Sequence, residues 1–180
     1  MGKRAAAEVA FAGVAAALLI GVQVGMSFLP NIELVSFLII LFTKHFGKRT
    51  LFAIYVFVIV EGLLYGFGIW WFMYLYVWAI LFLAAWIFRR MESILGWTVL
   101  SGLFGLFFGT FCSVVYILVN GWRTGVAGFI SGIPYDLAHC AGNIVAMLVL
   151  YIPMNRVARM IAQKMFPEEH PPAEPSGTES

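Results

Sequence analysis

Long apolar runs, separated by short polar or charged clusters, make up most of the chain. No charged residue lies between Glu8 and Glu33, which leaves enough chain for one membrane-spanning helix of about 20 residues. Five further apolar runs follow, at residues 32–43, 51–65, 70–88, 95–119 and about 134–152. The second run is short, so it spans a bilayer only if Glu33 lies at the membrane surface and the helix is short or partly enclosed. The pattern predicts an all-α integral membrane bundle of six helices.

Basic residues fall almost entirely in alternate connections between these runs. If the N-terminus is cytoplasmic, the cytoplasmic segments hold every basic residue except Arg123, namely Lys3, Arg4, Lys44, Lys48, Arg49, Arg89, Arg90, Arg156, Arg159 and Lys164. Cytoplasmic loops of membrane proteins carry an excess of Lys and Arg, so this asymmetry predicts that both termini are cytoplasmic. With five helices the alternation would fail, which favours counting the short second run as a span.

Composition agrees with a membrane protein and limits its functions. Of the 180 residues, 62% are hydrophobic and 11% are charged, whereas soluble domains carry about 25% charged residues. The short connections leave no room for a soluble ATPase or a separate catalytic domain. We expect a six-helix transmembrane domain over residues 1–166 and a disordered cytoplasmic tail over residues 167–180, which are rich in Pro, Glu and Ser.

Small residues recur along the first apolar run. They form a series at every fourth position and two further pairs with the same spacing: Gly13, Ala17, Gly21 and Gly25, then Ala12 with Ala16, and Ala6 with Ala10. Small residues at this spacing allow another helix to approach closely in lipid. They predict either packing within this bundle or a docking face for another membrane protein, and their abundance on several faces suggests both.

A polar stripe opens the sixth run. Pro134 suits the first turn of a helix, where its missing N–H is not needed. Asp136, His139 and Asn143 follow at i, i+3 and i+7, so on a helix they share one face within about 60°. Polar groups inside membranes are costly and usually face the bundle interior or a water-filled cavity. The stripe therefore predicts one wall of a polar site.

An acid in the third run and aromatic residues in the fourth run are further candidates for a polar site. Trp71, Tyr74 and Trp78 have the same i, i+3, i+7 spacing. They form either an aromatic belt at the membrane interface or flat surfaces for a planar ligand, and their common face favours the ligand. Glu61 lies about one turn from the end of its run; it either reaches the interface or takes part in ligand or proton binding.

The end of the fifth run carries a third stripe, Ser113, Tyr116 and Asn120. These side chains either hydrogen-bond a neighbouring helix or line a pocket. Glu33, in contrast, is interpreted as the solvated start of the second helix. With a cytoplasmic N-terminus, Glu61 and all three stripes lie in the outer half of the bundle. We therefore expect an outward-facing binding cup, covered by the connections at residues 28–32 and 121–130, rather than a channel.

Other classes of function remain open. An intramembrane enzyme would use Asp136, His139 and Glu61, with a metal ion as a conceivable partner, although no Ser or Cys nucleophile is paired with them by spacing. A stand-alone secondary transporter would be favoured by inverted repeats, which are absent because the short second run has no counterpart in the long fifth. A purely structural subunit would leave Glu61 unexplained.

Two sequence features carry a resemblance to a known family: the AxxxA patterns Ala12 with Ala16 and Ala6 with Ala10, and the sixth-helix start Ile133-Pro-Tyr-Asp136 followed by Asn143. With the six-helix topology, they make residues 5–160 similar to the substrate-binding (S) subunits of energy-coupling factor (ECF) vitamin transporters. His139 stands where several members have Lys.

The resemblance implies a multi-pass protein of a prokaryotic plasma membrane that captures a vitamin or related small molecule outside the cell. It implies docking through the first helix to a transmembrane coupling subunit driven by two ATPases. The chain itself has no GxxxxGKS or GxxxxGKT loop, so we expect no ATP hydrolysis by it. We predict no enzymatic activity, no catalytic residue, no metal or cofactor, and no nucleic-acid partner.

Overall fold

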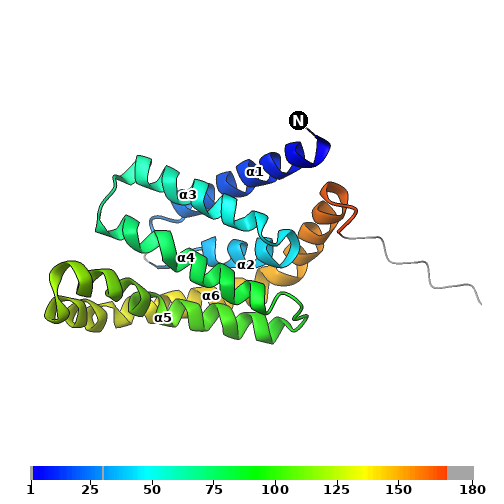
Figure 1. Ribbon diagram of the computed structural model, residues 1–180. Coiled ribbons are helices and arrows are strands. Elements are labelled where there is room, and N and C mark those ends of the chain that lie inside the picture. The colour runs from blue at the N-terminus through cyan, green and yellow to red at the C-terminus, as the bar shows by residue number, and fades with distance from the viewer. Residues whose placement is uncertain (1, 30, 170–180) are drawn as a thin grey trace, which may run out of the picture.

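The computed structural model describes residues 2–29 and 31–169, which form six helices and no strand. The helices are α1 (Lys3–Gly25), α2 (Val35–Phe46), α3 (Arg49–Tyr65), α4 (Ile69–Ile87), α5 (Ile94–Asn120) and α6 (Trp122–Met165). They lie side by side as a bundle (Figure 1). The predicted all-α class is confirmed for the described residues. Four helices, α1, α4, α5 and α6, are long and apolar enough to cross a membrane.

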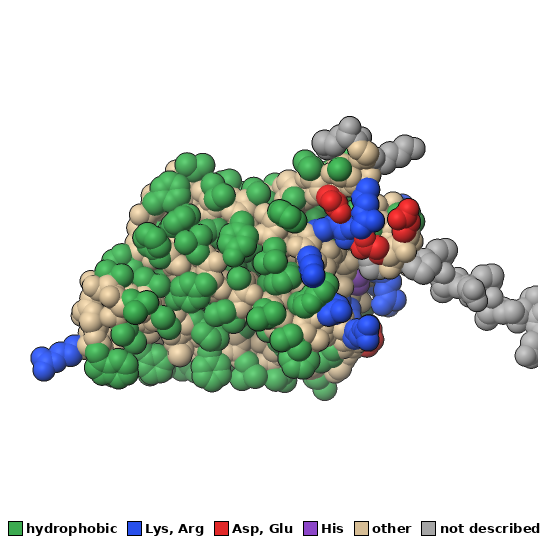
Figure 2. All heavy atoms as spheres, in the orientation of Figure 1, with side chains coloured by type: hydrophobic (Ala, Val, Ile, Leu, Met, Phe, Trp, Pro, Cys, Tyr) green, Lys and Arg blue, Asp and Glu red, His purple; other side chains and the backbone are tan. Residues whose placement is uncertain are grey.

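Apolar side chains cover the sides of the bundle, whereas charged groups gather at one end. In Figure 2 most acidic and basic side chains on the visible face lie at the right, near the C-terminal end of α6. Leu63, Leu118 and Val149 are 69%, 78% and 64% exposed. So broad an apolar surface is unfavourable in water but favourable against lipid tails. The fold therefore fits an integral membrane protein.

The short helix α2 lies in the middle of the bundle. All of its 12 residues except Lys44 are buried, and it packs against each of the other helices. At 1.5 Å per residue it is about 18 Å long, well short of a hydrocarbon core of about 30 Å. The other five helices enclose it, and partial enclosure was the condition under which so short a helix could belong to a membrane bundle.

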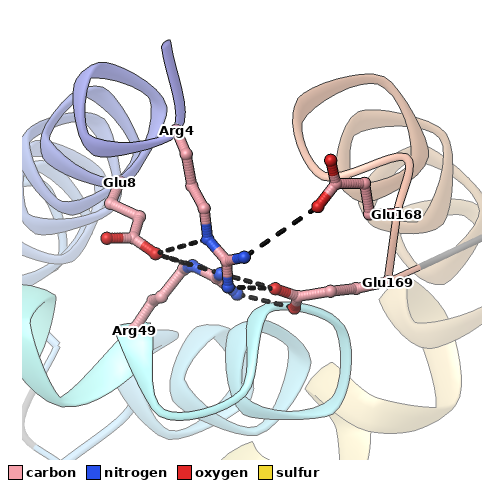
Figure 3. Close-up of polar contacts among 5 residues, drawn as sticks. All are labelled: Arg4, Glu8, Arg49, Glu168 and Glu169. Atoms are coloured by element: carbon pink, nitrogen blue, oxygen red, sulfur yellow. Dashed lines mark hydrogen bonds and ion pairs between the residues drawn. The ribbon is translucent and has the colours of Figure 1, made fainter. Parts of the chain in front are cut away.

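An ion-pair network joins three elements at the charged end (Figure 3). Arg49, at the start of α3, pairs with Glu8 of α1 at 3.1 Å and with Glu169 at 2.8 Å, counting N–O distances. Arg4 of α1 also reaches Glu169, at 2.9 Å. The side chain of Arg49 is only 14% exposed, so water screens these pairs less than it screens surface pairs. The network ties the ends of α1, α3 and α6 together.

The tail predicted to be disordered begins at residue 167. Residues 167–169 form a turn after α6, and Glu168 and Glu169 take part in the ion-pair network. The prediction for residues 170–180 lies outside the described residues.

The sixth helix begins earlier than predicted. A connection was expected before Pro134, but α6 starts at Trp122 and contains Pro134. Gly121 makes the tight turn between α5 and α6 with a φ of 82°, a conformation that glycine adopts readily. Gly125 then packs directly on α5, because a Cβ there would lie 3.1 Å from a backbone nitrogen of that helix. Packing against α5 therefore extends the helix past the point where proline alone predicted its start.

The far end of α6 changes partners. Figure 1 shows its orange C-terminal part turning away from α5 and toward α1. Pro153 lies inside α6, and proline removes one backbone hydrogen bond and kinks helices. With 44 residues, α6 is about 66 Å long, more than twice the thickness of a bilayer core. The turn brings Met154 and Ala158 to the groove that α1 also lines.

Candidate functional site

A cavity of about 380 Å³ lies at the end of the bundle opposite the ion-pair network. Its lining comes from every helix except α2 and from the connection between α1 and α2: Gln23, Met26, Ser27, Leu29, Asn31, Ile32, Glu33, Glu61, Tyr65, Trp70, Tyr74, Trp78, Phe108 and His139. Small-molecule sites commonly measure about 300–1,000 Å³ and combine apolar walls with a few polar groups. The size and the lining both fit a small ligand.

Glu61 and Trp78 line this cavity, and each carries a buried polar atom that no described residue satisfies. Glu61 is 2% exposed and Trp78 is 1% exposed. The Oε1 atom of Glu61 and the Nε1 atom of Trp78 are both buried without a hydrogen-bond partner in the described part of the chain. Nearly all buried polar groups in proteins are hydrogen-bonded, so such a pair at a cavity wall points to a partner outside the chain.

A second acid, Glu33, pairs across the cavity wall with His139. The His139 Nε2 atom lies 2.9 Å from Glu33 Oε1, and the two side chains are 3% and 12% exposed. Glu33 also accepts hydrogen bonds from the backbone N–H of Ser36, at 2.9 Å to Oε2, and from its hydroxyl. An acid at this point stabilises the N-terminus of α2. Sequence reasoning treated Glu33 as solvated; only the fold places α2 beside His139.

Aromatic rings build the apolar part of the wall. Trp70, Tyr74 and Trp78 follow one face of α4, and consecutive rings meet edge to face with centroids 5.2 and 5.4 Å apart. Phe108 of α5 continues the series, 5.7 Å from Trp78. Sequence reasoning named Tyr74 and Trp78 but missed Trp70 and Phe108. Trp70 lies four residues before Tyr74 and carried a usable helical signal, whereas Phe108 carried none.

Trp71 belongs to a different environment from its neighbours in the predicted stripe. Its Nε1–H donates a hydrogen bond of 2.9 Å to the carbonyl of Val58 on α3. Its ring packs edge to face against Phe67 at 5.1 Å. Trp71 is not among the lining residues and joins α4 to α3, because one helical step of about 100° turns it away from Trp70.

Two members of the sixth-helix stripe, Asp136 and Asn143, hydrogen-bond to α5 and do not line the cavity. Asp136 accepts a hydrogen bond of 2.9 Å from the backbone N–H of Gly109. Asn143 donates one of 3.0 Å to the carbonyl of Ser101. Both are buried, like His139 between them, so the stripe does face inward as its spacing suggested. Only His139 of the three reaches the cavity.

Tyr116 and Asn120 lie away from the cavity, on exposed positions near the end of α5. The hydroxyl of Ser113, in the same stripe, donates to the carbonyl of Gly109 one turn earlier, at 2.7 Å. α5 and α6 extend together as a hairpin there, so the end of α5 is separated from Glu61 and Trp78. The structure thus brings together Glu61, Tyr74, Trp78 and His139 from the predicted set and leaves the others outside.

Loop residues form the rim of the cavity. Leu29, Asn31 and Ile32, in the connection between α1 and α2, all line it. This is the first of the two connections expected to cover the site. The second, residues 121–130, is mostly helical and does not line the cavity.

The cavity is closed toward the charged end of the bundle. One to two turns from Glu61 and Trp78 in that direction, the side chains are apolar and have no exposed surface: Ile54, Phe57, Leu81, Ala85 and Met147. None of these residues lines the cavity, so the cavity ends above this layer. The site is a cup with an apolar floor.

The residues of the enzyme hypothesis do not all line the cavity. Glu61 and His139 line the cavity, but Asp136 does not. Among the described residues, no group of three or more His, Cys, Asp or Glu side chains is placed to hold a metal ion.

The predicted docking alanines divide between two surroundings. Ala16 is 1% exposed and Ala12 is partly buried, so both pack within the bundle. Ala6 and Ala10 are exposed, and Ala10 lines an apolar groove of about 410 Å³ between α1, α2 and α6.

No protein-family model matches the chain, and no curated protein or solved structure matches it. The resemblance to ECF S subunits stays a prediction.

Proposed function

We propose that this protein is a substrate-capture subunit of the cell membrane. It takes up a vitamin or related small molecule from outside the cell in the cavity that Glu61, Tyr74, Trp78 and His139 line. It then delivers the molecule inward together with an ATP-driven energy-coupling module. All six helices, including the short α2, belong to the membrane domain in this proposal.

The unsatisfied polar atoms of two residues that line the cavity carry the proposal. Leaving a buried donor or acceptor unsatisfied costs about 1–3 kcal/mol, and this cavity holds two, on Glu61 and Trp78. A ligand that hydrogen-bonds both would recover that energy. A merely structural subunit would gain by replacing both groups with apolar ones of similar size.

Charge supports an outward-facing cup. The basic residues of the helix ends at Arg49, Arg89 and Arg159 lie at the end opposite the cavity, and the positive-inside rule places that end in the cytoplasm. Impermeant maleimide applied to whole cells tests this. Labelling of Arg123→Cys but not of Arg90→Cys, both in a background lacking Cys112 and Cys140, is expected; the reverse pattern would contradict the orientation.

The apolar floor supports the need for a partner. Because packed side chains separate the cavity from the cytoplasmic end, the bundle has to be reoriented or opened for release. Such a change requires a free-energy input that a chain without a nucleotide-binding loop does not supply. The exposed face of α1 around Ala6 and Ala10 suits close approach by a helix of a coupling subunit.

Native mass spectrometry of the purified full chain tests the capture function. We expect one small molecule to copurify without ATP or partners, and Trp70→Ala to reduce its occupancy. Phe72→Ala is the matched control, because Phe72 is 54% exposed and does not line the cavity. Absence of any bound molecule, or equal loss in both variants, would refute the assignment of this cavity as the capture site.

A further inference from the structure

The cavity carries more acid than base. Its lining includes two carboxyl groups, on Glu33 and Glu61, and one imidazole, on His139, but no Lys or Arg. The charged side chains of the ion-pair network lie at the opposite end of the bundle. A ligand entering this cup therefore meets a site whose fixed charges are acidic.

One of the two acids, Glu33, already has partners within the protein. Glu33 is matched by His139 and by the backbone N–H and hydroxyl of Ser36. Glu61 has no ion pair among the described residues, and its Oε1 atom has no hydrogen-bond partner there. A buried carboxylate is strongly unfavourable unless an opposite charge compensates it. Among the described residues of the site, the one unpaired charge thus belongs to the carboxyl group of Glu61, a residue that lines the cavity.

The aromatic wall favours the same kind of ligand. Trp70, Tyr74 and Trp78 meet edge to face, and the face of an aromatic ring attracts cations. The cation–π contacts of the described residues involve Trp86, Trp97 and Phe166, which lie away from the cavity. Among the described residues, no Lys or Arg lies over the rings of Trp70, Tyr74 and Trp78, whereas the ring of Phe108 already meets His139 at 4.9 Å.

We propose that the cavity binds an organic cation with a flat ring, whose positive charge lies against Glu61 and whose ring lies among Trp70, Tyr74 and Trp78. This assignment deepens the proposed capture function and rests on it. The Nε1–H of Trp78 would donate to an acceptor on the same ring. A neutral or anionic ligand would leave the charge of Glu61 uncompensated.

Three soluble probes that share one pyridine ring test the charge preference. They are 1-methylnicotinamide, a cation; nicotinamide, which is neutral; and nicotinate, an anion. Binding to the purified full chain in detergent is measured by tryptophan fluorescence at constant ionic strength. We expect the cation to bind at least about tenfold more tightly than either other probe, equivalent to about 1.4 kcal/mol.

Glu61→Gln keeps the shape of the side chain and removes its charge. We expect it to abolish the preference for the cation while nicotinamide binds as before. Glu168→Gln is the control, because that side chain is 88% exposed at the other end of the bundle. Should Glu61→Gln fail to fold, Trp70→Leu serves instead and should weaken the cation more than nicotinamide.

Several results would overturn the assignment: equal or tighter binding of nicotinamide or nicotinate, an unchanged cation preference in Glu61→Gln, or no binding of any probe by the wild type. These outcomes differ from failure of the capture function. A copurifying neutral or anionic molecule would refute the cation and leave the receptor function intact, whereas an empty protein would refute that function.

Discussion

Gly105 lies where the backbones of α5 and α6 touch, which makes it a direct test of the packing that positions His139. A Cβ added there would lie 2.8 Å from the backbone nitrogen of Cys140 and 2.9 Å from the carbonyl carbon of His139. It would also lie 3.0 Å from Nδ2 of Asn143. Two of these atoms belong to the main chain of α6, so Gly105→Ala has to move the helix and not merely a side chain.

Three effects set the size of the change. Alanine is more favourable than glycine inside a helix by about 0.5–1 kcal/mol, and this effect alone would stabilise the variant. Overpacking of a tight contact costs about 1–3 kcal/mol. Displacing Asn143 also weakens its hydrogen bond to Ser101, worth about 1 kcal/mol. Together these predict a net loss of about 1–3 kcal/mol in the free energy of unfolding.

Equilibrium unfolding in mixed micelles with increasing dodecyl sulfate measures this loss, with tryptophan fluorescence and far-ultraviolet circular dichroism as probes. Gly13→Ala is the matched control, because a Cβ at that position of α1 meets nothing within 4 Å. We expect the control to equal the wild type or to exceed it by up to about 1 kcal/mol. If Gly105→Ala is as stable as Gly13→Ala, the close approach of α5 and α6 described above is incorrect.

Three further outcomes are expected. Trp78→Phe should weaken binding of the copurifying molecule about five- to tenfold, because it removes one hydrogen-bond donor. Trp71→Phe should lower stability and leave affinity unchanged, because Trp71 donates its hydrogen bond to Val58. Native mass spectrometry distinguishes the two outcomes. Asp136→Ala should destabilise the protein by about 1 kcal/mol or more in the same unfolding assay, because the part-buried N–H of Gly109 in α5 loses its carboxylate acceptor, and equal stability would contradict that role. Arg49→Gln should lower the free energy of unfolding by about 1 kcal/mol at low salt and by less at high salt, because salt screens its ion pairs. Arg90→Gln is the control, since Arg90 forms no ion pair with the described residues, and it should have no effect. Equal shifts in the two variants would argue against the network.

Much of the fold could be predicted because lipid imposes strict rules on a chain. Backbone groups cannot be satisfied by lipid, so each long apolar run of this chain had to form a helix. The positions of α3, α4 and α5 follow the predicted runs closely. The start of α6 did not, because the packing of Gly125 on α5 outweighs the tendency of Pro134 to begin a helix.

The candidate site could be predicted only in part, for a related reason. Helical spacing places residues on one face, and Asp136, His139 and Asn143 are indeed all buried. Spacing does not say which neighbour that face meets at each level. α5 lies against all three, but Asp136 and Asn143 hydrogen-bond its backbone, whereas His139 packs on Phe108 and pairs with Glu33.

The sequence alone determined that this protein is an apolar helical bundle with its basic residues concentrated at one end, because those features depend on composition and order along the chain. It also singled out Glu61, since an acid inside an apolar run is energetically costly and a structural role does not explain it. Only the tertiary structure decided that Glu61 lines a cavity beside Trp78, and that Glu33 pairs with His139. Those facts depend on how helices far apart in sequence are rotated and packed against one another, which side-chain contacts across the bundle fix.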